Sequence, residues 1–336
     1  MYVSQATAYE EFRRNFKLRT DEEALYRKIL VENDAIDGRY IAMRDTAEVV
    51  ELDQDQLIKR FAREGRKLGS MACQRAIQQA GYTKEDITGL IVNTCTGYLC
   101  PGLTSYLVED MGLRSDIRVR DIAGMGCGGA LPNLDSAAGM INQDPEAVVL
   151  SVSIEICTAT LFMGSSPDLV VSNSIFGDGA SAVVVDGRPE PKARILDFAS
   201  GLYPMHRDDL RYRTEEHRLR NVLSKTVPII AGRKVKEVLD NLLAKQGMSR
   251  EQLDFYALHP GGTQILDRVQ RDLELDRSKL KASHDILREY GNMSSPTVIY
   301  VLDRIIEETS PKTGQTLALL SFGAGFSVFA TLLEFC

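Results

Sequence analysis

The sequence predicts an α/β protein with two similar halves, each containing a mixed sheet, packed face to face through central helices into layers. Three observations lead to this fold class. The 336 residues are enough for about two domains of ordinary size. The chain resembles itself at an offset of 166 residues, the separation of Gly81 and Gly247. Its short, continuous runs of Val, Ile and Leu are typical of strands buried on both faces between helices.

The first repeated unit is a helix, a turn and a strand. Gly81 and Gly247 supply the left-handed turn that ends each helix. Thr83 and Ser249 are each followed three residues later by an acidic or amide side chain, as in a helix cap. The expected segments are helices over about 56–80 and 230–246, and strands over 89–92 and 255–258.

A second repeated unit follows, in which a helix leads into a strand. One helix opens at Gly126-Cys127 and the other at Asn292-Met293, and the strands that follow cover 147–154 and 317–322. A strand-like segment at 193–200 precedes the second copy, and its counterpart in the first half would lie before Met1. We therefore expect the first sheet to contain one strand fewer than the second.

Composition excludes several classes of protein. With 44% hydrophobic and 26% charged residues, the chain is an ordinary globular protein. Its formal charge of -7 and the lack of a long basic block predict no nucleic-acid partner. No apolar leader and no run long enough for a membrane span are visible, so we expect a soluble, cytoplasmic protein.

The six cysteines have irregular spacings, which lack the paired pattern of a structural zinc site, so no metal is expected. Free cysteines in apolar runs are usually small buried hydrophobes. One of them has a different setting. Cys127 follows a glycine-rich turn at the expected start of a helix, where the helix dipole favours the thiolate, so we expect a lowered pKa.

The two halves differ at equivalent positions, where they present polar groups suited to acyl chemistry. At the 166-residue offset Cys127 corresponds to Met293, and His259 corresponds to Asn93. His259 ends a strand, and Asn292 begins the second central helix. A thiolate can take an acyl group while imidazole and amide N–H groups stabilise an oxyanion or enolate. A papain-like hydrolase uses the same three residue types, so the residues alone leave both chemistries open.

Four motifs carry a resemblance to a known family: HPGG at 259–262, YGNMSS at 290–295, FGDGA at 176–180 and FGAG at 322–325. With them the chain resembles the chalcone synthase family, the type III polyketide synthases of the thiolase superfamily. The resemblance runs from about Val3 to the C-terminus, without the family's opening strand. It implies a thiolase-like duplicated fold in five layers (αβαβα). The halves would be residues 1–190, carrying the cysteine, and 191–336, carrying the histidine and asparagine.

The resemblance also implies a mechanism. Cys127 would carry the acyl chain from an acyl-CoA starter, while His259 and Asn292 assist decarboxylation of malonyl-CoA and stabilise the enolate. Repeated condensation and cyclisation would give a pyrone, resorcinol or phloroglucinol. No cofactor beyond the CoA thioesters is implied, and the family forms homodimers.

Further positions are assigned by the same resemblance. Phe176 matches a gatekeeper phenylalanine between the CoA tunnel and the cavity, whereas Asn221 stands where the family has a second one. Thr160, Ser172 and Ser294 would line the elongation cavity, and Cys100 would reach toward the partner subunit's cavity. The expected contacts for CoA are Lys28, Lys225, Gly261 and Gly262. The two lysines would otherwise be ordinary solvated surface residues.

Two alternatives share the three site residues. A ketoacyl synthase of the initiating type performs a single condensation, and a catalytically silent member would only bind acyl-CoA. A thiolase would need a second cysteine in the C-terminal glycine-rich loop, where residues 321–325 have none.

Overall fold

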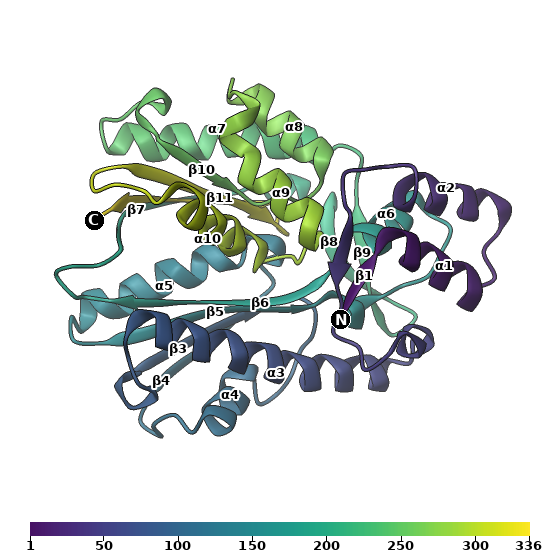
Figure 1. Cartoon of the computed structure of the whole chain (residues 1–336), viewed down its shortest axis with the longest axis horizontal. Coiled ribbons are helices and arrows are strands. Elements are labelled where there is room, and N and C mark those ends of the chain that lie inside the picture. Colours follow the sequence, from purple (N-terminus) through teal and green to yellow (C-terminus); the bar gives the residue numbers. More distant parts are fainter.

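The computed structural model describes residues 1–336 and contains two four-stranded sheets (Figure 1). The first sheet has the order β4-β3-β5-β6, with β6 antiparallel to three parallel strands. Its strands are β3 (Gly89–Thr94), β4 (Arg118–Ala123), β5 (Val148–Ile156) and β6 (Asp178–Asp186). The second has the order β10-β11-β12-β7 and is also mixed. Its strands are β7 (Ala193–Leu202), β10 (Phe255–Leu258), β11 (Thr316–Gly323) and β12 (Ser327–Phe335).

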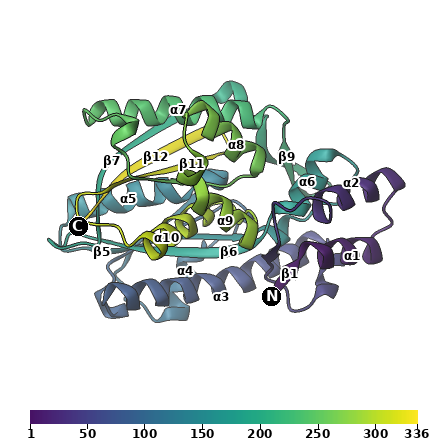
Figure 2. The same cartoon turned by 45° about the horizontal axis from the view of Figure 1, so that its top comes forward.

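Helices form three layers around these sheets (Figures 1 and 2). The central helices α5 (Ala130–Gln143) and α10 (Thr297–Thr309) each contact strands of both sheets. The outer face of the first sheet is covered by α3 (Gln54–Ala80) and α4 (Leu103–Met111). The outer face of the second is covered by α7 (Val227–Lys245), against which α8 (Thr263–Asp272) packs. The predicted layered fold is therefore observed.

Burial follows the apolar runs that predicted the strands. Every residue of β5 and of β11 is buried, because helices cover both faces of each sheet. Leu131 and Leu134 of α5 pack with Val298 and Val301 of α10 in a core cluster between the two sheets. The strands that end at the functional site are thus fixed from both sides.

The repeated helix ends are confirmed. Gly81 and Gly247 adopt the left-handed conformation, with φ of 74° and 63°. The backbone N–H of Thr83 donates to Asp86 Oδ2 at 2.8 Å, and that of Ser249 donates to Gln252 Oε1 at 2.7 Å.

The predicted difference in strand number is wrong, because both sheets have four strands. In the second sheet β7 pairs with β12, and in the first sheet the equivalent strand β6 is at the edge, with no strand beyond it. The strand expected to be missing from the first half is therefore absent. However, the first sheet gains a fourth strand at its other edge, where β4 pairs with β3. In the corresponding part of the chain the second half has the helix α9 (Lys281–Tyr290) instead of a strand. The repeat alone could not reveal β4, since only one half contains it.

Additional elements gather at one end of the layers, at the right of Figure 1. They are β1 (Tyr2–Ser4), α1 (Gln5–Asn15), α2 (Thr20–Leu30), β2 (Gly38–Tyr40), α6 (Pro167–Ile175), β8 (Leu210–Glu215) and β9 (Arg218–Leu223). The pairs β1-β2 and β8-β9 are separate two-stranded sheets. The boundary expected between residues 190 and 191 lies between β6 and β7.

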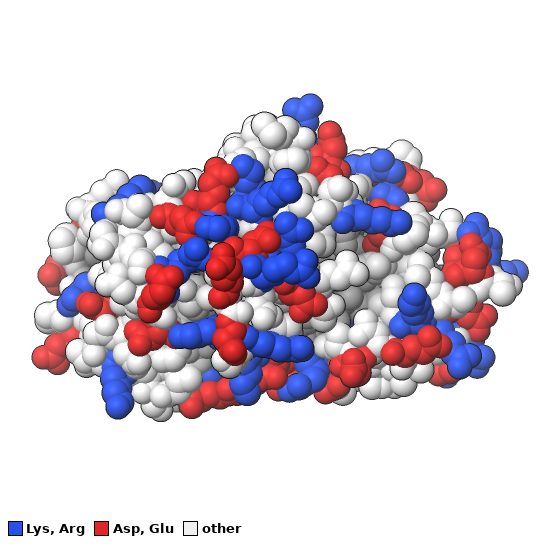
Figure 3. All heavy atoms as spheres, turned by 90° about the horizontal axis from the view of Figure 1, so that it is seen from above, with Lys and Arg blue, Asp and Glu red and all other residues white.

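Acidic and basic side chains are interspersed on the surface. The face in Figure 3 shows both signs mixed, without a continuous basic area. None of the helices combines the length and apolar character that crossing a membrane would require.

Candidate active site

Cys127 lies in a tight turn (Gly126–Gly128) directly before the central helix α5. This turn packs against the end of β11, where a Cβ atom on Gly323 would overlap the carbonyl oxygen of Met125 and come within 2.6 Å of Gly128 N. The hydroxyl of Ser321 donates to Gly128 O at 3.2 Å. The glycine of the FGAG motif therefore lets two backbone segments approach closely, and this contact fixes the position of the cysteine.

His259 follows β10 and is completely buried. Its backbone N–H donates to Leu320 O at 2.8 Å, and its ring meets Phe322 edge-on with centroids 5.3 Å apart. Both ring nitrogens lack a hydrogen-bond partner. Burial lowers the pKa of His259 to about 3, so the imidazole is neutral at pH 7 and its nitrogens are available to a bound molecule.

Asn292 connects the other parts of the site. Its backbone bridges to the segment at Phe176, with Gly177 N donating to Asn292 O at 2.9 Å. Ser294 N donates to Asn292 Oδ1 at 2.8 Å, and this fixes the orientation of the side-chain amide. The amide nitrogen Nδ2 then donates to Gly261 O at 3.3 Å. The Asn292 amide also lowers the pKa of the Cys127 thiol, so the two side chains lie near each other. The Asn292 side chain thus lies between Cys127 and the loop that begins at His259.

The expected low pKa of Cys127 is wrong in direction. Burial raises the pKa of its thiol to about 12, and the charge of Glu155 adds to this rise. Hydrogen bonds from Ser294 and Asn292 lower the pKa in part. Desolvation therefore outweighs the favourable position at a helix start, and the thiol is protonated at neutral pH.

A buried carboxylate beside Cys127 was not predicted. Glu155 on β5 has no exposed surface and accepts hydrogen bonds from Cys95 N at 3.0 Å and Ser295 Oγ at 2.6 Å. Cys95 Sγ lies 3.4 Å from Ser294 Oγ, so the network reaches a side chain that also lowers the pKa of Cys127. A single acidic residue in the otherwise apolar and small-residue strand VVLSVSIEI was the available sequence signal.

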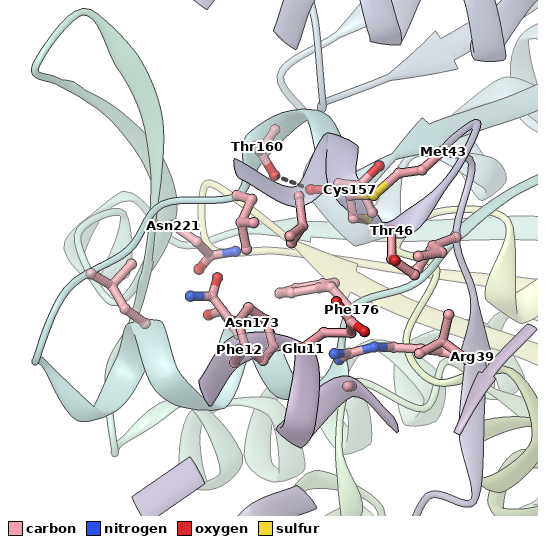
Figure 4. A pocket seen from close by; sticks show the side chains of 18 of the residues that line it. Glu11, Phe12, Arg39, Met43, Thr46, Cys157, Thr160, Asn173, Phe176 and Asn221 are labelled. Carbon is pink, nitrogen blue, oxygen red and sulfur yellow. Dashed lines mark hydrogen bonds between the residues drawn. The ribbon is translucent and has the colours of Figure 1, made fainter. Parts of the chain in front are cut away.

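A cavity that opens to solvent lies beside this site (Figure 4). Four of the predicted residues line it, namely Phe176, Thr160, Ser172 and Asn221. Sequence analysis missed Arg39, Cys157 and Tyr212, which also line it and come from elements outside the repeat. Tyr212 OH lies 3.2 Å from Thr160 Oγ1, and burial raises the pKa of Tyr212, with smaller contributions from nearby Cys95 and Glu155. The cavity therefore adjoins the buried network.

The other predicted residues lie elsewhere. Ser294 is in the network with Glu155, outside the cavity lining. Cys100 is exposed on the surface before α4. Gly261 and Gly262 follow His259, whereas Lys28 on α2 and Lys225 before α7 are exposed and free of ion pairs within 4 Å. The structure contains no cluster of three or more His, Cys, Asp or Glu side chains arranged to hold a metal ion.

Comparison with known families agrees with this geometry. Residues 1–258 match the family of FAE1/type III polyketide synthase-like proteins, and residues 198–335 match the C-terminal domain of chalcone and stilbene synthases. The chain belongs to the type III polyketide synthases. This confirms the family predicted from the four motifs and the acyltransferase class.

Two curated relatives of this type III polyketide synthase come from Streptomyces and Amycolatopsis. It is 31% identical over 310 residues to 1,3,6,8-tetrahydroxynaphthalene synthase of Streptomyces coelicolor, covering 90% of this chain and 81% of the relative. It is 29% identical to 3,5-dihydroxyphenylacetyl-CoA synthase of Amycolatopsis balhimycina, covering 90% and 83%. The crystal structure of the Streptomyces coelicolor A3(2) tetrahydroxynaphthalene synthase superimposes with a TM-score of 0.92 at 28% identity, covering 99% of this chain and 95% of that one. The predicted thiolase-like fold is thereby confirmed.

Proposed function

We propose that this type III polyketide synthase loads an acyl group from an acyl-CoA starter onto Cys127 and extends it with malonyl-CoA. The observation that supports this most directly is the grouping of the half-buried Cys127 thiol with the Asn292 amide, next to the loop that carries the unpartnered His259 imidazole. These groups can hold an acyl chain and donate to a developing oxyanion without any charged partner.

In the first step, the Cys127 sulfur attacks the thioester carbonyl carbon. Because the thiol and the imidazole are both neutral, its proton passes to His259 as the new S–C bond forms. The bond between the carbonyl carbon and the CoA sulfur then breaks, and CoA leaves as the thiol after taking this proton. The acyl chain is left on Cys127.

In the second step, malonyl-CoA loses CO2 in the same pocket. The electron pair of the broken C–C bond moves into an enolate, whose oxygen accepts hydrogen bonds from His259 and from the Asn292 amide nitrogen. The amide is oriented for this because its oxygen already accepts from Ser294 N. The enolate carbon attacks the Cys127 thioester carbonyl, a C–C bond forms, and the S–C bond breaks with its electron pair on sulfur, which takes one proton from solvent to restore the thiol. The extended chain is then on CoA and returns to Cys127 for the next round.

Repetition followed by ring closure gives a pyrone, resorcinol or phloroglucinol product. Decarboxylation supplies the carbanion, so the CoA thioesters are the only small molecules that this cycle requires. In this scheme Phe176 acts as a gatekeeper, and Thr160, Ser172 and Asn221 shape the cavity for the growing chain. Lys28 and Lys225, with the backbone at Gly261 and Gly262, bind CoA. We also assign the protein to the cytoplasm, in keeping with its six free cysteines.

The test is mass spectrometry of the products formed from malonyl-CoA with a panel of aliphatic and aromatic acyl-CoA starters. We expect pyrones or resorcinols that are absent with Cys127→Ala and unchanged with Cys336→Ala, which alters an exposed cysteine at the end of the chain. A single β-keto product would instead identify a one-step synthase. No product from the folded protein would indicate a silent acyl-CoA-binding member.

A further inference from the structure

Arg39 is a buried cation without a counter-ion in the cavity beside the site. It lies on β2 and is only 4% exposed. Its Nη1 atom has no hydrogen-bond partner, and no carboxylate lies within 4 Å of its guanidinium. A guanidinium withdrawn from water without a partner is costly, so such a group indicates a missing ligand.

The other strongly buried arginines differ from Arg39. Arg60 Nη1 donates to Thr158 O at 2.9 Å, and Glu48 lies 3.8 Å from its Nε. Arg220 donates to Ser166 Oγ at 2.9 Å and to Asp168 Oδ2 at 3.3 Å. Arg60 and Arg220 thus have hydrogen-bond and carboxylate partners within the protein, whereas the Arg39 guanidinium has none.

Two acidic residues near Arg39, Asp178 and Glu11, form their hydrogen bonds and ion pairs with other groups. Asp178 accepts from Ala42 N at 2.6 Å, and from Thr158 N at 2.8 Å and Oγ1 at 2.7 Å. Glu11, which also lines the cavity, pairs with Arg14 at 3.1 Å and accepts from Asn15 Nδ2 at 3.0 Å. Neither carboxylate is in contact with Arg39. Burial lowers the pKa of Arg39 to about 10 and the charge of Asp178 opposes this fall, so Arg39 is protonated at pH 7.

The position of Arg39 indicates where a ligand would meet it. Figure 4 shows its guanidinium pointing into the cavity, toward Phe176 and Glu11. Most of the lining is apolar, with Phe12, Ile41 and Leu161 among its residues. Asn221 Oδ1 is a second buried polar atom in this lining without a partner. An occupant that fits has an apolar chain and an anionic end, and a guanidinium binds a carboxylate through two parallel hydrogen bonds.

We propose that the cavity selects acyl-CoA starters whose acyl chain ends in a carboxylate, and that Arg39 binds this carboxylate. The proposal rests on the proposed function for the role of the ligand as a starter. Arg39 is then a specificity-determining residue, and a neutral chain of equal length leaves its charge unpaired.

Binding can be measured separately from polyketide formation. The protein carrying Cys127→Ala cannot take up the acyl group, and its affinity is measured by calorimetry for three pairs of thioesters: succinyl- and butyryl-CoA, glutaryl- and pentanoyl-CoA, and adipyl- and hexanoyl-CoA. Each pair has equal carbon number and differs in the terminal carboxylate. We expect at least about tenfold tighter binding of the carboxylated member in one or more pairs.

The preference is expressed as the ratio of affinities of the carboxylated and the neutral thioester in a pair. Adding Arg39→Met to Cys127→Ala should reduce this ratio to about one, and adding Arg39→Lys should retain part of the preference. The matched control is Arg44→Met, which removes an arginine 69% exposed outside the cavity and should leave the ratio unchanged. Arg39→Met should not lower the melting temperature, because no ion pair is broken. Equal affinity within all three pairs, or a ratio that survives Arg39→Met, overturns the proposal. Products from the wild-type protein test the proposed function independently, since polyketides can form from neutral starters whatever Arg39 does.

Discussion

At the scale of single residues, the site depends on groups that burial keeps uncharged. The pKa of Cys127 is raised to about 12 and that of His259 is lowered to about 3, and desolvation is the largest cause in both cases. A neutral imidazole has one N–H donor and one free acceptor, which suits a group that alternately receives and supplies a hydrogen bond. Charge therefore develops only when substrate is present.

This burial predicts how stability depends on pH. Between pH 7 and 5 the unfolded chain takes up a proton at His259, whereas the folded protein does not until about pH 3, so stability falls as pH falls. The contribution of His259 to this loss is about 2 kcal/mol. Urea denaturation gives the free energy of unfolding at pH 7 and at pH 5. The decrease between these two pH values should be smaller in His259→Gln than in the wild type by about 2 kcal/mol. His217→Gln, at an exposed histidine, should behave as wild type. Equal losses in wild type and His259→Gln would show that His259 is not held neutral.

At the scale of elements, the first sheet has an exposed edge strand, β4. β4 pairs with β3 on one side only, and none of its residues is buried. Val119 on this strand is 47% exposed, and Tyr98, in the segment before α4, is 78% exposed. Thr104 N donates to Asp121 Oδ1 at 3.3 Å, so the start of α4, just after Cys100, lies beside β4. An edge strand with exposed apolar side chains is suited to pairing with another chain.

We therefore predict that the protein is a homodimer joined at this edge, with Cys100 at or near the interface. Sedimentation analysis should give twice the 37.3-kDa mass of the chain. Val119→Asp should weaken association by at least about tenfold, because it brings like charges together at a symmetric contact. Val31→Asp, at a valine of similar exposure directly after α2, should leave the dimer intact. A monomeric wild type, or a dimer insensitive to Val119→Asp, would contradict this prediction.

Elements were predictable where the signal was local or repeated. The helix ends at Gly81 and Gly247 depend on residues within one turn, and the three site residues stand in short motifs. β4 and part of the cavity wall, including Arg39 and Tyr212, were missed because they belong to one half only. The network around Glu155 was missed for another reason, since Ser295 lies 140 residues away in the chain and only tertiary packing brings them together. The pKa of Cys127 was misjudged for the same reason, because the helix start is local and its burial is not.

At the scale of the whole molecule, duplication places different chemistry at equivalent strand and helix ends. The first half contributes Cys127, and the second contributes His259 and Asn292, while the additional elements at one end form the cavity. Neither half has the complete set of groups. The two sheets and the central helices hold these groups in fixed positions, so that the cavity lining can vary without moving the nucleophile.

The central claim is that Cys127 carries the acyl chain, and the most direct test is to locate that chain on the protein. After incubation with an acyl-CoA starter and proteolysis, tandem mass spectrometry should find the acyl mass on the peptide containing Cys127. It should be absent from every cysteine peptide of the Cys127→Ala protein. An acyl group on Cys95 or another cysteine of the wild-type protein, with Cys127 unmodified, would contradict the account.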